Sequence, residues 1–286
     1  MTKQRYGIIG HPVAHSLSPA MQGAAFKALG IDAEYLLYDV EPDKLEGFLD
    51  DAPKKNILGL NVTIPLKIAA KDYLERKGQL DENARRLGAV NTIKFTGETP
   101  SGHNTDGPGF YRSLVKDLNF EPEGKSVFSL GAGGAARAIV MYLANGPRAI
   151  YVFDSDGEKA GALQKYYKKY YDGRKLVITD RDGLKEALSK SDLLVNATPV
   201  GMREADPSPV AKELLHPGLY VYDLVYNQLS TRLVKDANSM KLHAITGLGM
   251  LLYQGAIAFE IWTGKSAPIS VMKKALREEI GKKDGS

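Results

Sequence analysis

The glycine-rich turn at residues 131–136 carries the clearest chemical signal in this 286-residue chain. It follows the apolar run 127–130 directly and has the pattern G-x-G-x-x-A, which ends at Ala136. The first glycine allows the tight bend, and the second lets backbone N–H groups approach a pyrophosphate. The pattern predicts a dinucleotide site whose phosphates lie at the positive end of the following helix. Its expected residues are Gly131, Ala132, Gly133, Gly134 and Ala135.

Asp154 ends a second apolar run, 149–153, and lies 23 residues after Gly131. A carboxylate at this point hydrogen-bonds a ribose 2′-hydroxyl but repels a 2′-phosphate. Asp156 adds a second negative charge nearby. We therefore expect NAD as the preferred cofactor, with NADP as the second option. In the alternative interpretation, Asp154 only begins the turn and caps the helix that starts near residue 158.

Lys67 follows the apolar run 57–62 and a short turn that contains Pro65. Proline suits the start of a helix, so Lys67 is expected in a first helical turn. The positive end of the helix dipole disfavours the charged ammonium there, which favours a role as proton donor. The alternative is an ordinary solvated lysine.

Two serine hydroxyls precede Pro19, those of Ser16 and Ser18. Ser18 suits the N-cap of a helix that begins at Pro19, and capping alone would explain it. Ser16 has no such role. A pair of hydroxyls at a strand-to-helix junction is suited to bind a polyhydroxylated ligand.

Asn91 and Asp106 stand at two further junctions, within the segments 88–92 and 104–107. Asp106 is either a favourable carboxylate in the first turn of a helix or the acid/base partner of Lys67. The carboxyl ends of parallel strands share one edge of a sheet, so these junctions are expected to converge.

Alternating strands and helices must position these residues. In the first hundred residues we predict a mostly parallel sheet, with strands at 5–9, 34–38, 57–62 and 90–95 and helices at 19–29, 43–49 and 66–76. A polar turn at 97–102 and a helix at 109–118 follow. Six more strands predict a complete doubly wound sheet, at 127–130, 150–153, 176–178, 193–196, 220–224 and 243–245. Helices at 250–262 and 271–280 end the pattern.

The predicted fold class is therefore α/β, with two domains. Residues 1–105 form an N-terminal α/β substrate-binding and catalytic domain, on which the helices of 248–286 pack back. Residues 106–247 form a doubly wound Rossmann domain that binds the dinucleotide.

The composition excludes several classes of function. The chain has no cysteine, and its five histidines show no metal-ligand spacing, so neither thiolate chemistry nor a metal is predicted. The net charge of +4 is mild, and the basic run 165–171 has the spacing of a helix with a solvated lysine face. Neither a secretory signal nor a membrane span is evident. We expect a cytoplasmic monomer or homodimer that binds neither nucleic acid nor membrane.

These motifs, in this order, resemble the shikimate dehydrogenase family, including its quinate/shikimate dehydrogenase relatives. The resemblance rests on the serine motif at 16–19 and on the segments 61–67, 88–92, 104–107, 131–136, 196–202, 247–250 and 262–264. It implies reversible hydride transfer between a nicotinamide and C3 of shikimate or 3-dehydroshikimate, a step in aromatic amino acid biosynthesis.

The resemblance also implies roles for single residues. Lys67 and Asp106 would hold the reacting oxygen and exchange its proton. The cyclic hydroxy acid would be bound by Ser16, Ser18, Thr63, Asn91 and Gln254. The cofactor would be lined by Asn196, Thr198, Val225, Gly247 and Met250. A ketone that accepts hydride develops negative charge on its oxygen, which needs the cation and proton source that Lys67 supplies.

Three departures from the family pattern stand out. Gln22-Gly23 replaces a usual histidine-asparagine pair, and Gln228 replaces a usual proline. The segment 154–156 lacks the asparagine-arginine-threonine cluster that favours NADP and resembles the NAD-preferring quinate/shikimate branch. Ser18, by contrast, resembles the shikimate-type serine. A quinate dehydrogenase of the same fold is therefore the nearest alternative, and a non-catalytic metabolite sensor is a more distant one.

Overall fold

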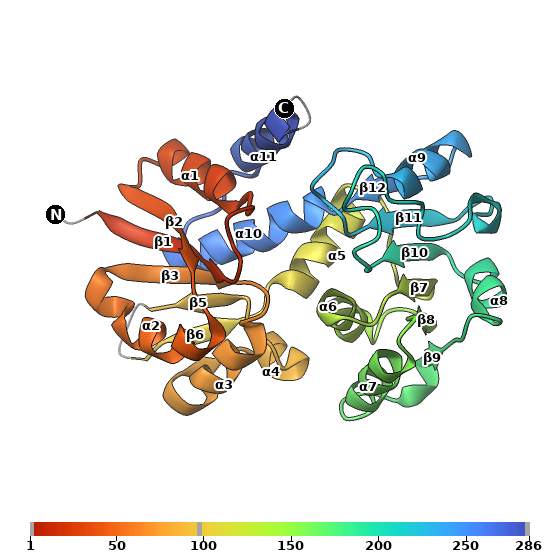
Figure 1. Ribbon diagram of the computed structural model, residues 1–286, viewed down its shortest axis with the longest axis horizontal. Coiled ribbons are helices and arrows are strands. Elements are labelled where there is room, and N and C mark those ends of the chain that lie inside the picture. Colours follow the sequence, from red (N-terminus) through yellow and green to blue (C-terminus); the bar gives the residue numbers. More distant parts are fainter. Residues whose placement is uncertain (1–2, 96–98, 284–286) are drawn as a thin grey trace. The chain divides into compact units, whose positions relative to one another are not determined.

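The chain forms two compact units in the computed structural model, which describes residues 3–95 and 99–283. Unit 1 comprises Met1–Thr105 and Leu252–Ser286, and unit 2 comprises Asp106–Leu251 (Figure 1). Each unit contains its own six-stranded sheet, so the predicted α/β class is confirmed. The sequence placed domain boundaries at 105/106 and 247/248, and the units divide at 105/106 and 251/252.

The sheet of unit 1 has the strand order β2-β1-β3-β5-β6-β4. Its strands are β1 (Gln4–Gly10), β2 (Ala33–Asp39), β3 (Ile57–Val62), β4 (Gln79–Leu80), β5 (Thr92–Lys94) and β6 (Ser101–His103). The pairs β1–β2, β1–β3 and β4–β6 are parallel, whereas β5 runs antiparallel to both of its neighbours. The prediction of a mostly parallel sheet therefore holds for its first three strands.

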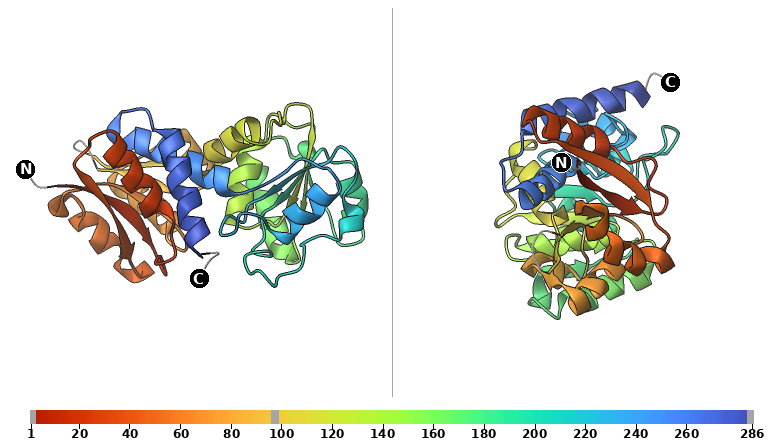
Figure 2. Two further views of the ribbon diagram at one scale, coloured as in Figure 1. Left: turned by 90° about the horizontal axis from the view of Figure 1, so that it is seen from above. Right: turned by 90° about the vertical axis from the view of Figure 1, so that its left-hand side faces the viewer.

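Helices cover the sheet of unit 1. They are α1 (Ser18–Ala28), α2 (Leu45–Asp51), α3 (Lys67–Lys77), α4 (Glu82–Leu87), α10 (Leu248–Thr263) and α11 (Ile269–Lys283), with the short 3-10 helices η1 (Pro42–Lys44) and η2 (Pro53–Lys55). Figure 2 shows α1 and α11 side by side, although they come from opposite ends of the chain. The indole of Trp262 in α10 donates to the carbonyl of Ile93 at 2.9 Å, which attaches α10 to β5.

Unit 2 contains an entirely parallel sheet with the order β12-β11-β10-β7-β8-β9. Its strands are β7 (Ser126–Leu130), β8 (Ala149–Phe153), β9 (Leu176–Ile178), β10 (Leu193–Asn196), β11 (Tyr220–Asp223) and β12 (Ala244–Thr246). This is the doubly wound order, in which the connections reverse direction between the first strand, β7, and the fourth, β10. The predicted Rossmann sheet is confirmed.

One helix of unit 2, α5 (Asp106–Lys116), precedes β7, and the others connect the strands. They are α6 (Gly134–Leu143), α7 (Gly157–Tyr167), α8 (Leu184–Ser189) and α9 (Arg232–Ser239), with the 3-10 helices η3 (Gly173–Lys175) and η4 (Lys212–Leu214). Because the strands are covered on both faces, they consist of apolar runs, and the central strand β10 is fully buried.

One segment of the sequence prediction was wrong. Residues 101–102, assigned to the end of a polar turn, belong to β6, which lies between β5 and β4, and residues 97–98 of that turn lie outside the described residues. Ser101 and Gly102 lack the apolar alternation that marks a strand, so periodicity alone missed this element. The two-residue strand β4 and the one-turn helix α4 were also not predicted.

Candidate active site

The loops that follow β1 and β3 meet at one edge of the sheet in unit 1. The N–H of His11 donates to the carbonyl of Ile64 at 3.2 Å, and the N–H of Thr63 donates to that of Ile9 at 2.9 Å. A Cβ on Gly10 would lie 2.4 Å from Cγ2 of Thr63, so glycine permits this close approach. β1 lies between β2 and β3, which makes this edge a topological switch point, where open α/β sheets bind ligands.

Neither serine of this edge is the N-cap of α1. Helix α1 begins at Ser18, and its N-cap is Leu17, whose side chain makes no capping hydrogen bond. The hydroxyl of Ser16 instead accepts the backbone N–H of Ser18 at 3.2 Å. The N-cap assignment of Ser18 was therefore wrong, because the helix starts one residue earlier than Pro19 suggested. Capping does not explain the buried Ser18 hydroxyl.

Lys67 is the first residue of α3, at the positive end of that helix. The N-cap of α3 is Leu66. The carbonyl of Lys67 accepts the N–H of Val90 at 2.9 Å, and the N–H of Val62 donates to the carbonyl of Asn91 at 2.8 Å. These bonds hold the segment 90–91 against the turn that carries Thr63 and Lys67.

Asn91 is buried and links this turn to the end of unit 1. Its Oδ1 accepts the backbone N–H of Thr105 at 2.8 Å, and its Nδ2 lies 3.0 Å from the Thr105 hydroxyl. Unit 1 therefore brings together Ser16, Ser18, Thr63, Lys67 and Asn91 around the carboxyl ends of β1 and β3. Gln254 lies in α10, next to Gly255, whose carbonyl accepts the buried amide of Gln22 at 2.8 Å.

Asp106 directly follows Thr105 and is the first residue of α5, where it is buried to 9% exposure. Sequence reasoning did not select Tyr226 of unit 2, although Tyr226 belongs to the Val-Tyr-Asn segment 225–227. Tyr226 is 41% exposed, and desolvation of its phenol together with the negative charge of Asp106 raises the pKa of that phenol. The phenol therefore lies within electrostatic reach of Asp106. The sequence feature that could have identified Tyr226 is its position just after a predicted strand of the Rossmann sheet.

The glycine-rich turn of unit 2 lies at the switch point between β7 and β10. Gly131 has φ +102°, and a Cβ there would lie 2.9 Å from the carbonyl oxygen of Ala197. Both features require glycine. Gly133 is the N-cap of α6, and no atom lies within 4 Å of a Cβ built on Gly133 or Gly134. The open backbone at this helix start fits a pyrophosphate.

Asp154 lies at the end of β8 beside this turn. Its Oδ2 accepts the N–H of Ala132 at 2.8 Å, and its Oδ1 accepts the N–H of Asp156 at 2.9 Å. The cap of α7 is Asp156, which accepts the N–H groups of Glu158 and Lys159. The alternative in which Asp154 caps this helix was therefore wrong. Asp154 is instead bonded to the glycine-rich turn itself.

Asn196 is the last residue of β10, and its side chain bonds the turn that follows. Its Nδ2 donates to the carbonyl of Val200 at 3.1 Å and to Asp223 at 2.8 Å. Its Oδ1 accepts the backbone N–H and the hydroxyl of Thr198, at 3.1 and 2.7 Å. The Asn196 side chain is thus fully occupied within the protein, and it shapes the segment 197–201 that abuts Gly131.

The remaining candidates of unit 2 lie after β11 and β12. Val225 is buried, and its carbonyl accepts the N–H of Gly247 at 3.0 Å. A Cβ on Gly247 would lie 2.2 Å from the carbonyl oxygen of Leu224, so this position needs glycine. Met250 lies in the first turn of α10, where its N–H donates to the phenol of Tyr222 at 3.2 Å.

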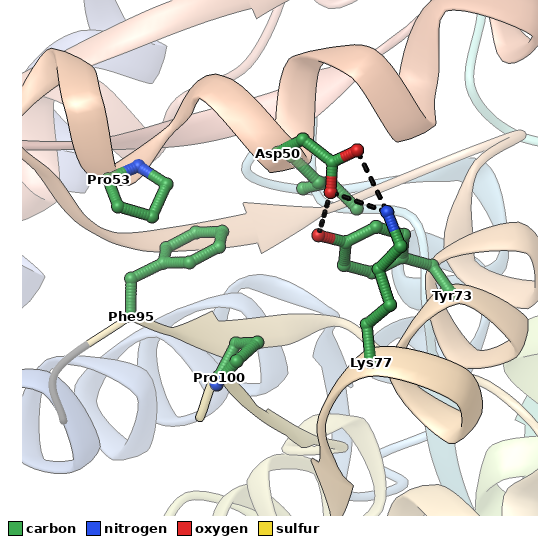
Figure 3. A pocket seen from close by; sticks show the side chains of 7 residues that line it. Asp50, Pro53, Tyr73, Lys77, Phe95 and Pro100 are labelled. Atoms are coloured by element: carbon green, nitrogen blue, oxygen red, sulfur yellow. Dashed lines mark hydrogen bonds and ion pairs between the residues drawn. The ribbon is translucent and has the colours of Figure 1, made fainter. Parts of the chain in front are cut away.

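A separate cavity of about 280 Å³ lies elsewhere in unit 1, and no candidate residue lines it (Figure 3). Its polar wall is an ion pair in which Lys77 lies 2.8 Å from Asp50, and Tyr73 donates to the same carboxylate at 2.8 Å. Because these groups bind one another, none of the described polar groups of this wall is directed at a ligand.

Residues 3–95 and 99–283, which the structure describes, contain neither a metal-binding cluster nor a membrane-spanning helix. No group of three or more histidine, aspartate or glutamate side chains is arranged there to hold a metal ion. No helix in the same part of the chain is long and apolar enough to cross a membrane.

Unit 2 is a doubly wound sheet with a glycine-rich turn at its switch point, and unit 1 carries clustered hydroxyl, amide and ammonium groups. These two features define a nicotinamide-dependent oxidoreductase. The chain belongs to the shikimate dehydrogenase family. The family description "Shikimate dehydrogenase substrate binding domain" matches residues 8–93, and "Shikimate 5'-dehydrogenase C-terminal domain" matches residues 247–277.

Individual relatives cover almost the whole chain. The shikimate dehydrogenase (NADP(+)) of Methanopyrus kandleri is 45% identical over 96% of this chain and 95% of its own length. A crystal structure of a shikimate dehydrogenase with NADP+ has 39% identity and a TM-score of 0.90, covering 97% and 96% of the two chains. The shikimate 5-dehydrogenase of Listeria monocytogenes, in complex with shikimate and NAD, has 33% identity, a TM-score of 0.87 and 96% coverage of both. The NADP(+) names of close relatives do not support the expected preference for NAD.

Proposed function

We propose that this protein is a shikimate dehydrogenase that interconverts shikimate and 3-dehydroshikimate. The observation that supports this most directly is the cluster of Ser16, Ser18, Thr63, Lys67 and Asn91 at one sheet edge of unit 1. Its hydroxyl and amide groups suit the carboxylate and hydroxyls of a cyclic acid, and its single cation suits a reacting oxygen. Gln254 is proposed as a further ligand of the substrate hydroxyls.

Lys67 and Asp106 are proposed as the groups that exchange the proton of the reacting oxygen. The bound nicotinamide supplies or accepts the hydride at C3. In reduction of the ketone, the ammonium of Lys67 stabilises the developing negative charge and donates a proton to the oxygen. In oxidation, the pair removes the hydroxyl proton.

The substitution Lys67→Met tests this assignment, because it keeps the length of the side chain and removes the charge. We expect kcat for shikimate oxidation to fall by about 10²- to 10⁴-fold. Lys71→Met is the matched control one turn further along α3. Lys71 pairs with Asp72 and Glu75, each at 2.8 Å, and its loss is expected to leave kcat unchanged. Equal kcat values in wild type and Lys67→Met would refute the catalytic role.

The cofactor is proposed to bind the glycine-rich turn, with its ribose beside Asp154 and its nicotinamide end near Asn196, Thr198, Val225, Gly247 and Met250. We propose a preference for NAD over NADP. The support for this proposal is the pair of carboxylates, Asp154 and Asp156, that follows β8 beside the glycine-rich turn, with Lys159 paired to Asp156 at 3.3 Å. A doubly negative phosphate would be repelled by this arrangement.

Initial rates with NAD and NADP test the cofactor proposal, on shikimate and on quinate. We expect kcat/KM for NAD to exceed that for NADP by about tenfold or more, because like charges oppose each other. Asp154→Asn should narrow this ratio. A wild-type enzyme that favours NADP, as the names of its relatives suggest, would overturn the proposed use of Asp154. Faster turnover of quinate than of shikimate would assign the alternative substrate.

A further inference from the structure

A network of hydrogen bonds between buried polar groups crosses the sheet of unit 1, near the edge that carries Ser16, Ser18, Thr63, Lys67 and Asn91. The phenol of Tyr35 in β2 donates to Oδ1 of Asn61 in β3 at 2.7 Å. Nδ2 of Asn61 donates to the hydroxyl of Thr92 at 3.2 Å and to the carbonyl of Asn91 at 3.3 Å. Tyr35, Asn61 and Thr92 are all buried. Both polar atoms of the Asn61 side chain therefore make hydrogen bonds within this network.

The hydrogen-bond network continues to Thr105, the last residue of this part of unit 1. The hydroxyl of Thr92 donates to Oδ1 of Asn91 at 3.0 Å, and the same oxygen accepts the backbone N–H of Thr105 at 2.8 Å. Thr105 is the residue that precedes Asp106. The orientation of the Asn91 amide is thus determined by partners that Asn61 and Thr105 hold in place.

At its other end the hydrogen-bond network reaches Ser18. Burial raises the pKa of the Tyr35 phenol, and a hydrogen bond from Ser18 acts in the opposite direction. The Ser18 hydroxyl is therefore a neighbour of the same phenol that binds Asn61. The Tyr35 hydroxyl therefore lies between Ser18 and Asn61, and Asn61 in turn donates to the carbonyl of Asn91.

The packing around Tyr35 does not itself require a hydroxyl. Its ring lies 6.2 Å from that of Trp262, in an aromatic cluster with Tyr6. Phenylalanine would fill the same space. A buried polar group is costly unless it is hydrogen-bonded, and a satisfied network fixes the geometry of its members.

We propose that Tyr35 is a positioning residue for substrate binding, whose phenol holds Asn61, and through it Asn91, in register with Ser18. Tyr35 does not touch the substrate. Its removal leaves Asn61 Oδ1 without its donor, which loosens the amide that holds the Thr92 hydroxyl and the Asn91 carbonyl, whereas the bonds of Asn91 to Thr105 remain. The proposal rests on the substrate roles proposed above for Ser18 and Asn91.

The test compares Tyr35→Phe with Tyr6→Phe. Tyr6 is the register partner of Tyr35 on β1, is also buried and belongs to the same cluster, but among the described residues its phenol reaches only Gln4, at 3.5 Å. We expect Tyr35→Phe to raise KM for shikimate about fivefold, the equivalent of one hydrogen bond, with kcat within about twofold of wild type. Calorimetric titration with shikimate should show the same loss of affinity. Tyr6→Phe should change neither quantity.

The variant Ser18→Ala distinguishes a failure of the Tyr35 proposal from a failure of the substrate site on which it rests. If Ser18→Ala raises KM and Tyr35→Phe does not, the positioning role of Tyr35 is overturned while the substrate site stands. If Ser18→Ala leaves KM unchanged, the substrate assignment falls and the role of Tyr35 falls with it. An equal rise of KM in Tyr35→Phe and Tyr6→Phe would mean that the aromatic cluster, not the phenol of Tyr35, controls binding.

Discussion

Asp223 is a fully buried carboxylate at the end of β11 in unit 2. Burial raises its pKa, although hydrogen bonds from the Thr231 hydroxyl, the Val225 N–H and the Asn196 amide act in the opposite direction. Its raised pKa means that the folded protein keeps this proton after the unfolded chain has released it. The stability associated with the protonated form is therefore lost as pH rises through the raised pKa.

The substitution Asp223→Asn should remove this pH dependence. Below the ordinary aspartate pKa of 3.8, the variant and wild type differ only by the amide itself. As the pH rises above that value, the variant should gain free energy of unfolding relative to wild type, and the gain should level off above the raised pKa. Urea unfolding followed by circular dichroism at several pH values measures it.

Asp172→Asn provides the opposite case as a control. A side-chain hydrogen bond from Arg174 lowers the pKa of Asp172, so its contribution appears above the ordinary pKa and is lost on acidification. This variant should lose stability relative to wild type as pH rises. The same slope in both variants would contradict the assignment of a raised pKa to Asp223.

At the scale of elements, the contact between β3 and α10 depends on Gly59. A Cβ there would lie 2.4 Å from Cδ1 and Nε1 of the Trp262 indole, which is buried and donates to Ile93. A rigid ring cannot yield as the end of a flexible side chain would, so an added methyl group must displace α10 from the sheet.

We expect Gly59→Ala to lower the free energy of unfolding by about 1–3 kcal/mol, the usual cost of overpacking. Gly23→Ala on α1 is the control, because no atom lies within 4 Å of its added Cβ. Alanine should stabilise that helix position by about 0.5–1 kcal/mol. Thermal unfolding monitored by the fluorescence of Trp262, the single tryptophan, reports both changes. Equal stability of the two variants would argue against the contact.

At the scale of the whole molecule, the end of the chain completes the unit formed by its beginning. Residues from 252 onward belong to unit 1, and α11 packs against α1. Met272, Leu276 and Ile280 are fully buried although α11 is otherwise rich in charged residues. The stability of the N-terminal sheet therefore depends on residues more than two hundred positions away in sequence.

Leu276→Ala should cost about 2–5 kcal/mol, because it leaves a cavity among buried side chains. Lys274→Ala is the control on the same helix, since Lys274 is exposed and its ion pair with Glu278 spans 3.8 Å. Amide hydrogen exchange should show the loss of protection in α1, β1 and β2. Unchanged protection there in Leu276→Ala would mean that α11 does not stabilise the N-terminal sheet.

The sequence alone was sufficient for features that depend on neighbouring residues. The turn at Gly131, the strand that ends in Asp154 and the helix that begins near Lys67 follow from local patterns of apolar residues, glycine and proline. The alternating strands and helices also predicted the doubly wound sheet. These features are set by backbone geometry and periodicity, which a short segment expresses by itself.

Only the tertiary structure decided which partners the polar side chains find. It showed that Ser16 accepts the N–H of Ser18, that Asp154 binds the Ala132 N–H and that Asn196 is occupied by its own turn. It also revealed β6, and it joined Tyr35 to Asn61 across two strands. Hydrogen bonds between distant segments leave no periodic pattern in a sequence, because their geometry exists only once the sheet has formed.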